Sequence, residues 1–409
     1  MPLPKSLSGH ALFVAALCLT GTAVADDFQA CIGELRDTAR QTGITEDTIN
    51  IGLADIVQQT RVLELDSRQP EFFQTFWQYM DVRVTDDRIQ RGRQLLEEHR
   101  TLLDRVHRDF GVRPNYLVAF WGLETNFGAY FGKMPVLDSL ATLACDPRRS
   151  RYFTSELMEA LRILDAGHIP RDDMLGSWAG AMGHTQFMPS TFNAHAIDYD
   201  DDGRIDLWSS LPDAFASSAR YLSDMGWRDG ERWGREVRVP DDFRWNLAGL
   251  DNARPLEEWA DLGIRRADGG TLPVADMDAA LVLPAGHRGP AFLVYNNFRK
   301  IMRWNTSISY ALAVGHLADR IAGMGTLHAS APNDERALLR EEIEEIQGVL
   351  NALGHDSGTP DGMVGRLTRQ AIRDYQQGND LPADGYPDVT LLERLRGEIT
   401  AREPLIYSQ

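Results

Sequence analysis

Apolar residues recur at three- and four-residue intervals through most of the first 230 positions. From residue 87 to residue 110 this apolar stripe consists of Ile89, Leu95, Leu96, Leu102, Leu103, Val106 and Phe110. Such a stripe lines one face of an amphipathic helix. The same spacing predicts helices over residues 28–56, 115–123, 155–164, 212–225 and 308–321. We therefore expect a mainly α fold.

The spacing changes between residue 231 and about residue 290. Pro, Gly and Asp interrupt short pieces in which polar and apolar residues alternate, as in Arg235–Val239. Alternation of this kind is typical of strands and turns. Because the helical spacing returns at Phe292, we expect residues 231–290 to form a small β-containing insert within one larger domain, residues 26–325.

Small and turn-forming residues interrupt the pattern again over residues 323–333 and predict a linker, residues 326–334. Beyond it, helical spacing over residues 335–350, 366–375 and 391–395 predicts a three-helix module, residues 335–400. A module of about 65 residues is near the lower size limit for a core that folds by itself.

The N-terminus has the layout of a secretory signal sequence. Lys5 precedes an apolar run over residues 11–24, and residues 23–25 are all small. The run is shorter than the roughly 20 apolar residues that a membrane span needs. We expect cleavage after residue 25 and no stable membrane anchor, with an N-terminal anchor as the alternative. Cys18 lacks the flanking residues of a lipid-modified cysteine.

Export would place the chain in an oxidising compartment. Cys31 and Cys145 would remain after cleavage, and they either pair or stay as two buried thiols, because spacing does not tell whether their Cα atoms come within about 7 Å. The formal net charge of -18 becomes -18 - 1 = -19 when Lys5 is removed. This acidity argues against nucleic acid as a partner.

Glu124 is the candidate catalytic residue on local grounds. It follows an apolar helical segment that contains Tyr116, Phe120 and Trp121. A carboxyl group among apolar neighbours loses hydration, which disfavours its ionised form and retains a proton for donation. The alternative is a solvated glutamate on the exposed edge of the helix, the usual place for this residue type.

Three separated stretches resemble the membrane-bound lytic transglycosylase B family. They are residues 120–128 (FWGLETNFG), residues 180–190 (GAMGHTQFMPS) and residues 295–310, which contain Tyr-Asn-Asn-Phe and Trp-Asn-Thr-Ser segments. They occur in the family's order, and the resemblance covers about residues 28–321. It implies a lysozyme-like helical domain that cleaves the glycan strands of peptidoglycan.

The resemblance also implies that a single carboxylate performs the chemistry. Hydrolytic glycosidases normally need two carboxyl groups, about 5 to 5.5 Å apart for retention or about 6.5 to 9.5 Å for inversion, and the other two motifs contain none. In the family one glutamate, here Glu124, protonates the oxygen between MurNAc and GlcNAc and then accepts the proton of the muramyl 6-hydroxyl. That hydroxyl attacks C1 and closes a 1,6-anhydro ring, helped by the high effective molarity of a tethered group. The alternatives are a hydrolytic muramidase and a non-catalytic wall-binding scaffold.

The resemblance assigns substrate binding to Ser177, Gln186, Tyr221, Asn305, Tyr310, Arg148, Arg149 and Tyr152. The serine is expected close to the glutamate, and the amides and the first two tyrosines line the amino-sugar site. The arginine pair and Tyr152 would meet lactyl and peptide carboxylates, which a guanidinium binds with two parallel hydrogen bonds. Each of these residues could instead serve packing or the surface. Trp304 stands where the family has a tyrosine, which puts a substrate hydrogen bond there in doubt.

Residues 198–206 open like an EF-hand calcium loop, with oxygen-bearing residues at positions 1, 3, 5 and 9 and glycine at position 6. Position 12 is Ser209 instead of the usual glutamate, so the resemblance makes a later acid the closing ligand. Close carboxylates repel unless a cation offsets them. We expect a structural Ca²⁺, with a solvated acidic turn as the alternative, and no cofactor for the chemistry. The candidate ligands are Asp198, Asp200, Asp202, Arg204 and Asp213.

The C-terminal module resembles a small peptidoglycan-binding domain. The matching positions are residues 346–354, Asp361–Gly365, residues 368–376 and Asp384-Gly385. The resemblance implies that the module tethers the enzyme and so raises the local concentration of glycan strands; a purely stabilising appendage is the alternative. The sequence thus predicts a periplasmic enzyme acting on peptidoglycan and does not identify its protein partners.

Overall fold

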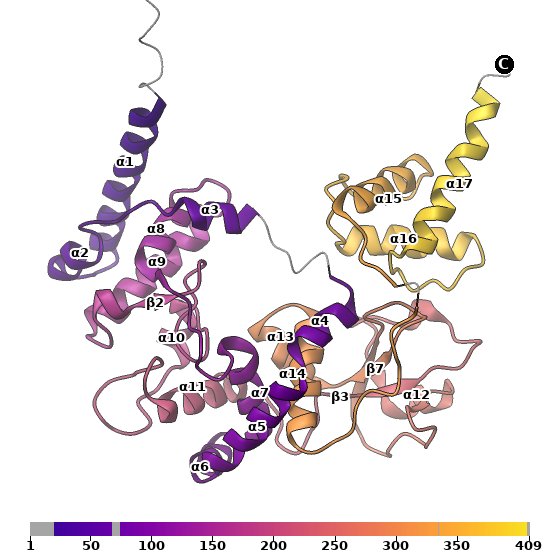
Figure 1. The fold of residues 1–409 in the computed structure, drawn as a ribbon, viewed down its shortest axis with the longest axis horizontal. Coiled ribbons are helices and arrows are strands. Elements are labelled where there is room, and N and C mark those ends of the chain that lie inside the picture. The colour runs from indigo at the N-terminus through magenta and orange to yellow at the C-terminus, as the bar shows by residue number, and fades with distance from the viewer. Residues whose placement is uncertain (1–19, 68–73, 334, 407–409) are drawn as a thin grey trace, which may run out of the picture. The chain divides into compact units, whose positions relative to one another are not determined.

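The computed structural model describes residues 20–67, 74–333 and 335–406, which form two compact units (Figure 1). The first unit contains residues up to 66, 132–181 and 188–193, and the second contains residues 67–131, 182–187 and 194–409. Helices dominate both units, which confirms the predicted mainly α class. The predicted signal sequence lies outside the described residues, except that residues 20–25 belong to the first helix. No described helix is both long and apolar enough to cross a bilayer.

Helices α8 and α9 pack side by side in the first unit, and α2 packs on α9. The predicted helix over residues 28–56 is divided in two, because Gly43 adopts a left-handed conformation at φ 85° and Thr45 caps the next helix. The elements are α1 (Thr20–Gln41), α2 (Glu46–Gly52), α3 (Thr60–Ser67), β1 (Met134–Pro135), α8 (Val136–Ala144), α9 (Ser150–Asp165), β2 (Leu175–Gly176) and most of α10 (Pro189–His195).

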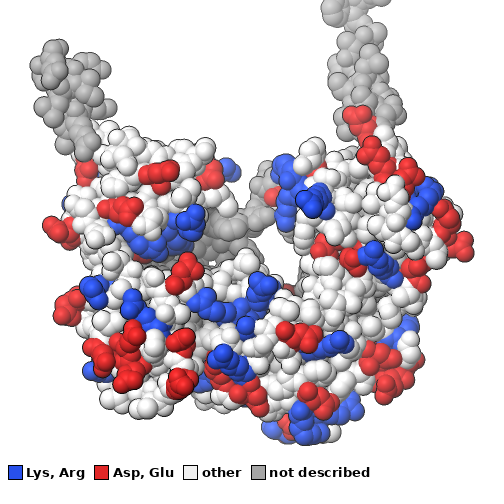
Figure 2. Space-filling model, turned by 180° about the vertical axis from the view of Figure 1, so that it is seen from behind, with Lys and Arg blue, Asp and Glu red and all other residues white. Residues whose placement is uncertain are grey.

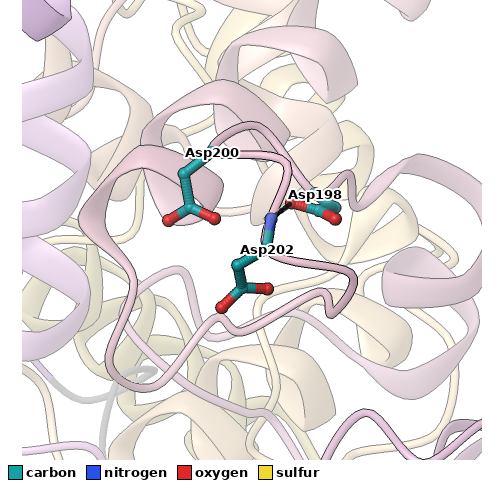
Figure 3. Close-up of side chains that lie close together, drawn as sticks. All are labelled: Asp198, Asp200 and Asp202. Carbon is teal, nitrogen blue, oxygen red and sulfur yellow. Dashed lines mark hydrogen bonds between the residues drawn. The ribbon is translucent and has the colours of Figure 1, made fainter.

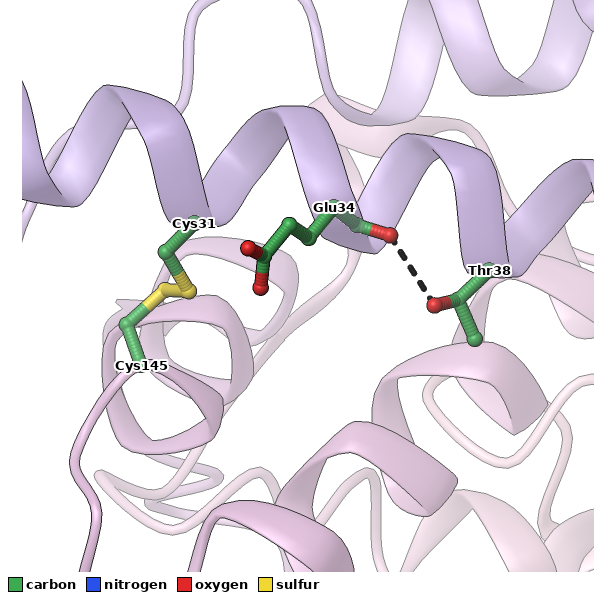
Figure 4. Close-up of a disulfide and its surroundings, with 4 residues drawn as sticks. All are labelled: Cys31, Glu34, Thr38 and Cys145. Carbon is green, nitrogen blue, oxygen red and sulfur yellow. Dashed lines mark hydrogen bonds between the residues drawn. A yellow bond between two sulfur atoms is a disulfide. The ribbon is translucent and has the colours of Figure 1, made fainter.

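A disulfide between Cys31 and Cys145 joins α1 to the end of α8 (Figure 4). The two Cα atoms lie 6.0 Å apart, within the range that a bridge requires. The sequence left pairing and separate thiols open, and the structure contains the bridge.

The core of the second unit is built around a buried helix, α7 (Pro114–Thr125), which packs against four other helices. Its residues are apolar on all sides, as expected for a helix surrounded by protein. Pro114 occupies its first turn and Asn126 ends it in a left-handed conformation. The packed helices are α5 (Asp86–Glu98), α6 (Arg100–Phe110), α11 (Leu211–Asp224) and α14 (Ile308–Ile321), and α4 (Phe76–Arg83) and α13 (Asn296–Trp304) complete the core.

An antiparallel sheet with the order β4-β6-β7-β3-β5 interrupts the helical part of the second unit. All four residues of β7 are buried, and a strand buried on both faces lacks polar alternation. The expected return of helical spacing at Phe292 is therefore wrong: Phe292 lies on β7, whose apolar run does not look like a strand, and α13 begins at Asn296. The sheet elements are β3 (Gly234–Arg238), β4 (Arg254–Pro255), β5 (Arg265–Arg266), β6 (Asp278–Val282) and β7 (Ala291–Val294), with α12 (Leu256–Asp261) after β4.

Three C-terminal helices share a separate apolar core that includes Ile346, Ile372 and Leu392. They are α15 (Arg340–Ala352), α16 (Arg366–Gly378) and α17 (Val389–Ile406). Helix α15 begins later than the predicted residue 335, because the carboxylate of Glu342 accepts the N–H of Leu339 at 2.8 Å and caps its start. The two Asp-Gly pairs occupy equivalent turns: the side-chain oxygens of Gln347 and Gln376 accept the N–H groups of Gly362 at 2.9 Å and Gly385 at 2.8 Å.

Candidate active site

Glu124 lies in the last turn of α7 and is half-buried. The hydroxyl group of Tyr310, in the first turn of α14, donates a hydrogen bond to Glu124 Oε1. Tyr310 is itself only 6% exposed. The hydrogen bond therefore fixes the orientation of the Glu124 carboxyl group relative to α14, on which Tyr310 is buried.

Aromatic side chains form one wall beside Glu124. Phe120 is one helical turn before Glu124, on the same face of α7, and its ring stacks on Trp304 with the centroids 4.4 Å apart. The Trp304 ring also contacts Phe187 at 5.2 Å and Tyr221 at 5.4 Å. At the position where the resembling family has a tyrosine, the indole of Trp304 thus packs among aromatic rings.

Gln186 lies in a tight turn that fixes its side-chain amide. Its backbone has a left-handed φ of 49°, and Nε2 donates to the carbonyl oxygens of Phe131 at 3.1 Å and Gly183 at 3.0 Å. A Cβ atom at Gly183 would lie 2.4 Å from the carbonyl oxygen of Leu207, so only glycine fits there. With both amide hydrogens occupied, the side-chain oxygen of Gln186 can act as a hydrogen-bond acceptor.

His184 links this turn to the helix that carries Glu124. Its Nδ1 accepts a hydrogen bond from Trp121 Nε1 at 2.8 Å, and its carbonyl oxygen accepts one from Thr125 Oγ1 at 3.3 Å. Burial lowers the pKa of His184 to about 4, so the ring is neutral and remains an acceptor for the indole. This contact was not predicted from the sequence, although His184 stands two residues before Gln186 in the motif.

Tyr221 and Asn305 lie in the same unit as Glu124, as expected for a common lining. The hydroxyl of Tyr221 donates to the carbonyl oxygen of Arg303 at 2.9 Å. The side-chain oxygen of Asn305 accepts the N–H of Ser307 at 3.0 Å. Each side chain is thus held by the backbone around the start of α14.

The other four predicted substrate-binding residues lie in the first unit. Ser177 follows β2, and its Oγ accepts the N–H of Ala181 at 3.0 Å. Arg148 and Arg149 lie before α9, where both contact the side chain of Asp66, at 3.0 Å and 3.4 Å. Tyr152 is 44% exposed, with the guanidinium of Arg149 5.6 Å from its ring centroid. The two arginines therefore already have an acidic partner.

The side chains of Asp198, Asp200 and Asp202 converge in one loop (Figure 3). Each offers an oxygen, and these oxygens lie within 4.8 Å of one another. Calcium binds oxygen ligands at about 2.3 to 2.6 Å, so oxygens at this separation can share one ion. The loop also orders itself, because Asp198 accepts the N–H groups of Asp202 at 3.1 Å and Gly203 at 2.8 Å.

Asp213, the expected closing ligand, is not part of this cluster. It is fully buried, and its two carboxylate oxygens accept the N–H groups of Tyr199 at 2.7 Å and Asp206 at 2.8 Å. Burial raises the pKa of Asp213 above its ordinary value; the two N–H bonds oppose this rise, and the charges of Asp200 and Asp198 add to it. Asp213 therefore fixes the two ends of the loop from inside.

We expect calcium to stabilise the protein against heat through this loop. A ligand present at about 100 times its Kd stabilises the folded state by about 2.7 kcal/mol. Differential scanning fluorimetry with and without CaCl₂ should show a higher Tm, and Asp202→Asn should reduce the rise. Asp241→Asn removes an exposed carboxylate elsewhere in the same unit and should leave the rise intact. A Tm that is independent of calcium in the unmutated protein would rule out the site.

The model of the Transglycosylase SLT domain family matches residues 27–319, more than half of the chain. The chain belongs to this family. It is therefore an enzyme of the transglycosylase type, and the resemblance seen in the three motifs is confirmed. A second model, the putative peptidoglycan binding domain, matches residues 340–395, over α15, α16 and the first turns of α17.

Solved structures of this family share the fold. SltB3 from Pseudomonas aeruginosa, in complex with NAG-anhNAM-pentapeptide, is 44% identical with a TM-score of 0.87, and the match covers 90% of this chain and 99% of that one. The Escherichia coli lytic transglycosylase Slt35, in complex with calcium, is 29% identical with a TM-score of 0.62 over 72% of this chain and 92% of that one. These matches confirm the lysozyme-like fold class.

A curated relative agrees in family but not in length. It is the membrane-bound lytic murein transglycosylase B of Escherichia coli K12, which is 32% identical over 252 residues. The match covers 58% of this chain and 65% of the relative. The chain thus spans just under two thirds of that protein.

Proposed function

We propose that this chain cleaves the β-1,4 bond between MurNAc and GlcNAc in peptidoglycan and leaves a 1,6-anhydro-MurNAc end. One observation carries the proposal: the carboxyl group of Glu124, in the domain of a transglycosylase family, is held by Tyr310 beside an aromatic wall. The SltB3 complexes with NAG-NAM-pentapeptide and its anhydro counterpart support the same substrate class.

The first step is proton donation by Glu124. Its protonated carboxyl group gives a proton to the glycosidic oxygen, and the bond from that oxygen to C1 of MurNAc breaks. The hydroxyl of Tyr310 then stabilises the carboxylate that forms, because a hydrogen bond to a charged acceptor is stronger than one to a neutral acceptor.

The second step uses the same side chain as a base. The 6-hydroxyl of the muramyl residue attacks C1, and the Glu124 carboxylate accepts the proton that this hydroxyl loses. A C1–O6 bond replaces the glycosidic bond, the enzyme regains its starting protonation, and water is not consumed. The internal nucleophile requires no second protein carboxylate, in agreement with the absence of acidic residues from the other two motifs.

The remaining predicted residues would hold the sugars. The side-chain oxygen of Gln186, whose NH₂ group is already engaged, suits the N–H of an acetamido group. Asn305 and Tyr221 offer further polar groups, and Ser177 is proposed to lie close to the reacting sugar. Arg148, Arg149 and Tyr152 are proposed to bind lactyl or peptide carboxylates, which would have to compete with Asp66 for the guanidinium groups.

Mass spectrometry of sacculi digested by the purified protein tests the reaction. We expect muropeptides with anhydromuramyl ends. A hydrolytic muramidase would instead give products heavier by one water, with reducing ends. A wall-binding scaffold would release no products at all. Either of the last two results would overturn the proposal.

We further propose that the chain is exported to the periplasm after loss of residues 1–25, and that residues 26–325 act as the catalytic domain with a β-containing insert over residues 231–290. The linker would be residues 326–334 and the binding module residues 335–400.

Basic and acidic side chains are mixed across the face shown in Figure 2, and the chain is acidic as a whole. This favours a carbohydrate polymer over nucleic acid as the partner.

The binding module should matter only for insoluble substrate. Tethering raises the effective substrate concentration, so deleting residues 335–409 should slow the digestion of whole sacculi by at least about tenfold. Turnover of a soluble disaccharide-peptide oligomer should stay within about twofold, because α15–α17 have a core of their own and tethering does not act on soluble substrate. Equal losses on both substrates, at an unchanged Tm, would contradict a tethering role.

A further inference from the structure

A pocket of about 410 Å³ opens beside the loop that follows Glu124. Its walls come from the start of α5, with Asp87, Arg88 and Arg91, and from residues 126–129. Consecutive Cα atoms are 3.8 Å apart, so the Cα atom of Asn126 lies within about 7.6 Å of that of Glu124. One wall of the pocket is therefore the segment that directly follows the candidate catalytic residue in the chain, and the pocket uses none of the residues assigned to the site above.

One wall of this pocket is held in a strained conformation by the core. Phe127 has a left-handed φ of 59°, which is unfavourable for a bulky residue. Its ring fills a space between α5 and α7, where a Cβ atom at Gly122 would lie 2.8 Å from the ring atoms. Gly92 on α5 is close to the same ring. The loop over residues 126–129 is thus fixed by packing, and the pocket is preformed.

The charges that face the pocket are not balanced. Its lining has two arginines, Arg88 and Arg91, and one acidic residue, Asp87. Neither arginine has an ion-pair partner in the described part of the chain. This local excess of positive charge contrasts with the whole chain, which has 60 acidic and 42 basic residues. Arg88 donates from Nη1 to the carbonyl oxygen of Val82 at 3.2 Å, while its Nε is buried without a partner. Burial, and then the positive charge of Arg83, lower the pKa of Arg88. An anion in the pocket would offset both effects.

We propose that this pocket binds a carboxylate of the peptide carried by the muramyl residue at the cleavage site. The proposal rests on the proposed function, because it takes peptidoglycan as the substrate. Guanidinium groups bind carboxylates through two parallel, charge-assisted hydrogen bonds. The pocket gives the enzyme a preference for peptide-bearing over peptide-free glycan strands, and it is built from other residues than the pair Arg148 and Arg149.

Steady-state kinetics with two soluble glycan oligomers, one with stem peptides and one stripped of them by an amidase, test this inference. Arg91 is exposed, so Arg91→Glu should fold normally. We expect it to lower kcat/KM on the peptide-bearing oligomer at least about tenfold more than on the stripped one, mainly through KM, since the charge-assisted hydrogen bonds to the peptide carboxylate are lost. Arg91→Lys, which keeps the charge but not the two-pronged geometry, should fall between.

Arg108→Glu on α6 is the matched control, because it reverses an exposed charge away from the pocket. It should leave the ratio of the two kcat/KM values unchanged. Titration calorimetry with the free stem peptide should show binding that Arg91→Glu weakens. An unchanged substrate ratio in Arg91→Glu, or binding of inorganic phosphate in place of the peptide, would overturn the inference. Failure of the proposed function would look different, since neither oligomer would then yield anhydromuramyl ends.

Discussion

Replacement of Glu124 by Gln should reduce the release of anhydromuropeptides at least about 10³-fold, since general acid and base catalysis each contribute about 10² to 10⁴. Gln has nearly the same shape and can still accept the hydrogen bond from Tyr310, but it neither donates a proton to the glycosidic oxygen nor accepts one from the 6-hydroxyl. The loss should appear in kcat and not in KM, because the carboxyl group acts on the bond that breaks and not on the parts of the substrate that bind. Initial rates on soluble oligomers, measured by mass spectrometry, give both constants.

The structure supplies a matched control for this substitution. Glu97→Gln changes an exposed glutamate on α5 that pairs with Arg100, and it should retain the full rate. The Tm of both variants should lie within about 2 °C of the unmutated protein, because neither change creates a cavity or leaves a buried charge without a partner. If Glu124→Gln kept more than about a tenth of the rate, the loss would be smaller than general acid catalysis normally provides, and another group would have to be the acid.

The apolar spacing predicted the positions of helices well, but it predicted helix ends poorly where a turn or a capping residue ends one helix and starts the next. Periodicity alone placed α14 at residues 308–321, as observed. It ran two helices together at residues 28–56 because Gly43 and Thr45 interrupt the chain without changing the apolar spacing. In the same way α5 and α6 are separated at His99, whose backbone leaves the helical conformation. The buried strand β7 was not predicted, because it has no polar face and so no alternation of polar and apolar residues.

The candidate site was predictable only as a set of residue types. The motif identified Glu124, but not that Tyr310, 186 positions later, would donate to its carboxylate. That contact depends on how α7 packs on α14, which no local pattern encodes. The bond between Trp121 and His184, and the left-handed backbone of Phe127, likewise arise from packing between distant segments.

The acidic loop shows the opposite case. Its spacing predicted that Asp198, Asp200 and Asp202 would converge, and the structure brings their oxygens together. It also suggested Asp213, but counting positions does not reveal burial. The side chain of Asp213 is used to bind the backbone of Tyr199 and Asp206. A sequence pattern thus predicts which side chains converge when they are adjacent on one loop, but it does not predict the burial of a side chain on the helix that follows.

Loss of the disulfide should destabilise the first unit more than any single surface substitution. The bridge between Cys31 and Cys145 closes a separation of 114 residues, and the chain-entropy model gives at most about 4 to 5 kcal/mol for a loop of this length. Cys31→Ser should therefore lower the Tm clearly. Cys145→Ser and the double variant should lower it by the same amount, because each removes the same bond. Calorimetry on the chain from residue 26, which lacks Cys18, measures all three.

A reductant separates loss of the bridge from loss of packing. Dithiothreitol should lower the Tm of the unmutated protein to that of Cys31→Ser and should leave the three variants unchanged. At temperatures where the first unit remains folded, the variants should keep their catalytic activity. Neither cysteine has a role in the proposed reaction, and Glu124 and Tyr310 lie in the other unit. If dithiothreitol left the Tm of the unmutated protein unchanged, the bridge would not be formed in solution. If the double variant fell well below the single ones, the thiols would contribute through packing as well as through the bond.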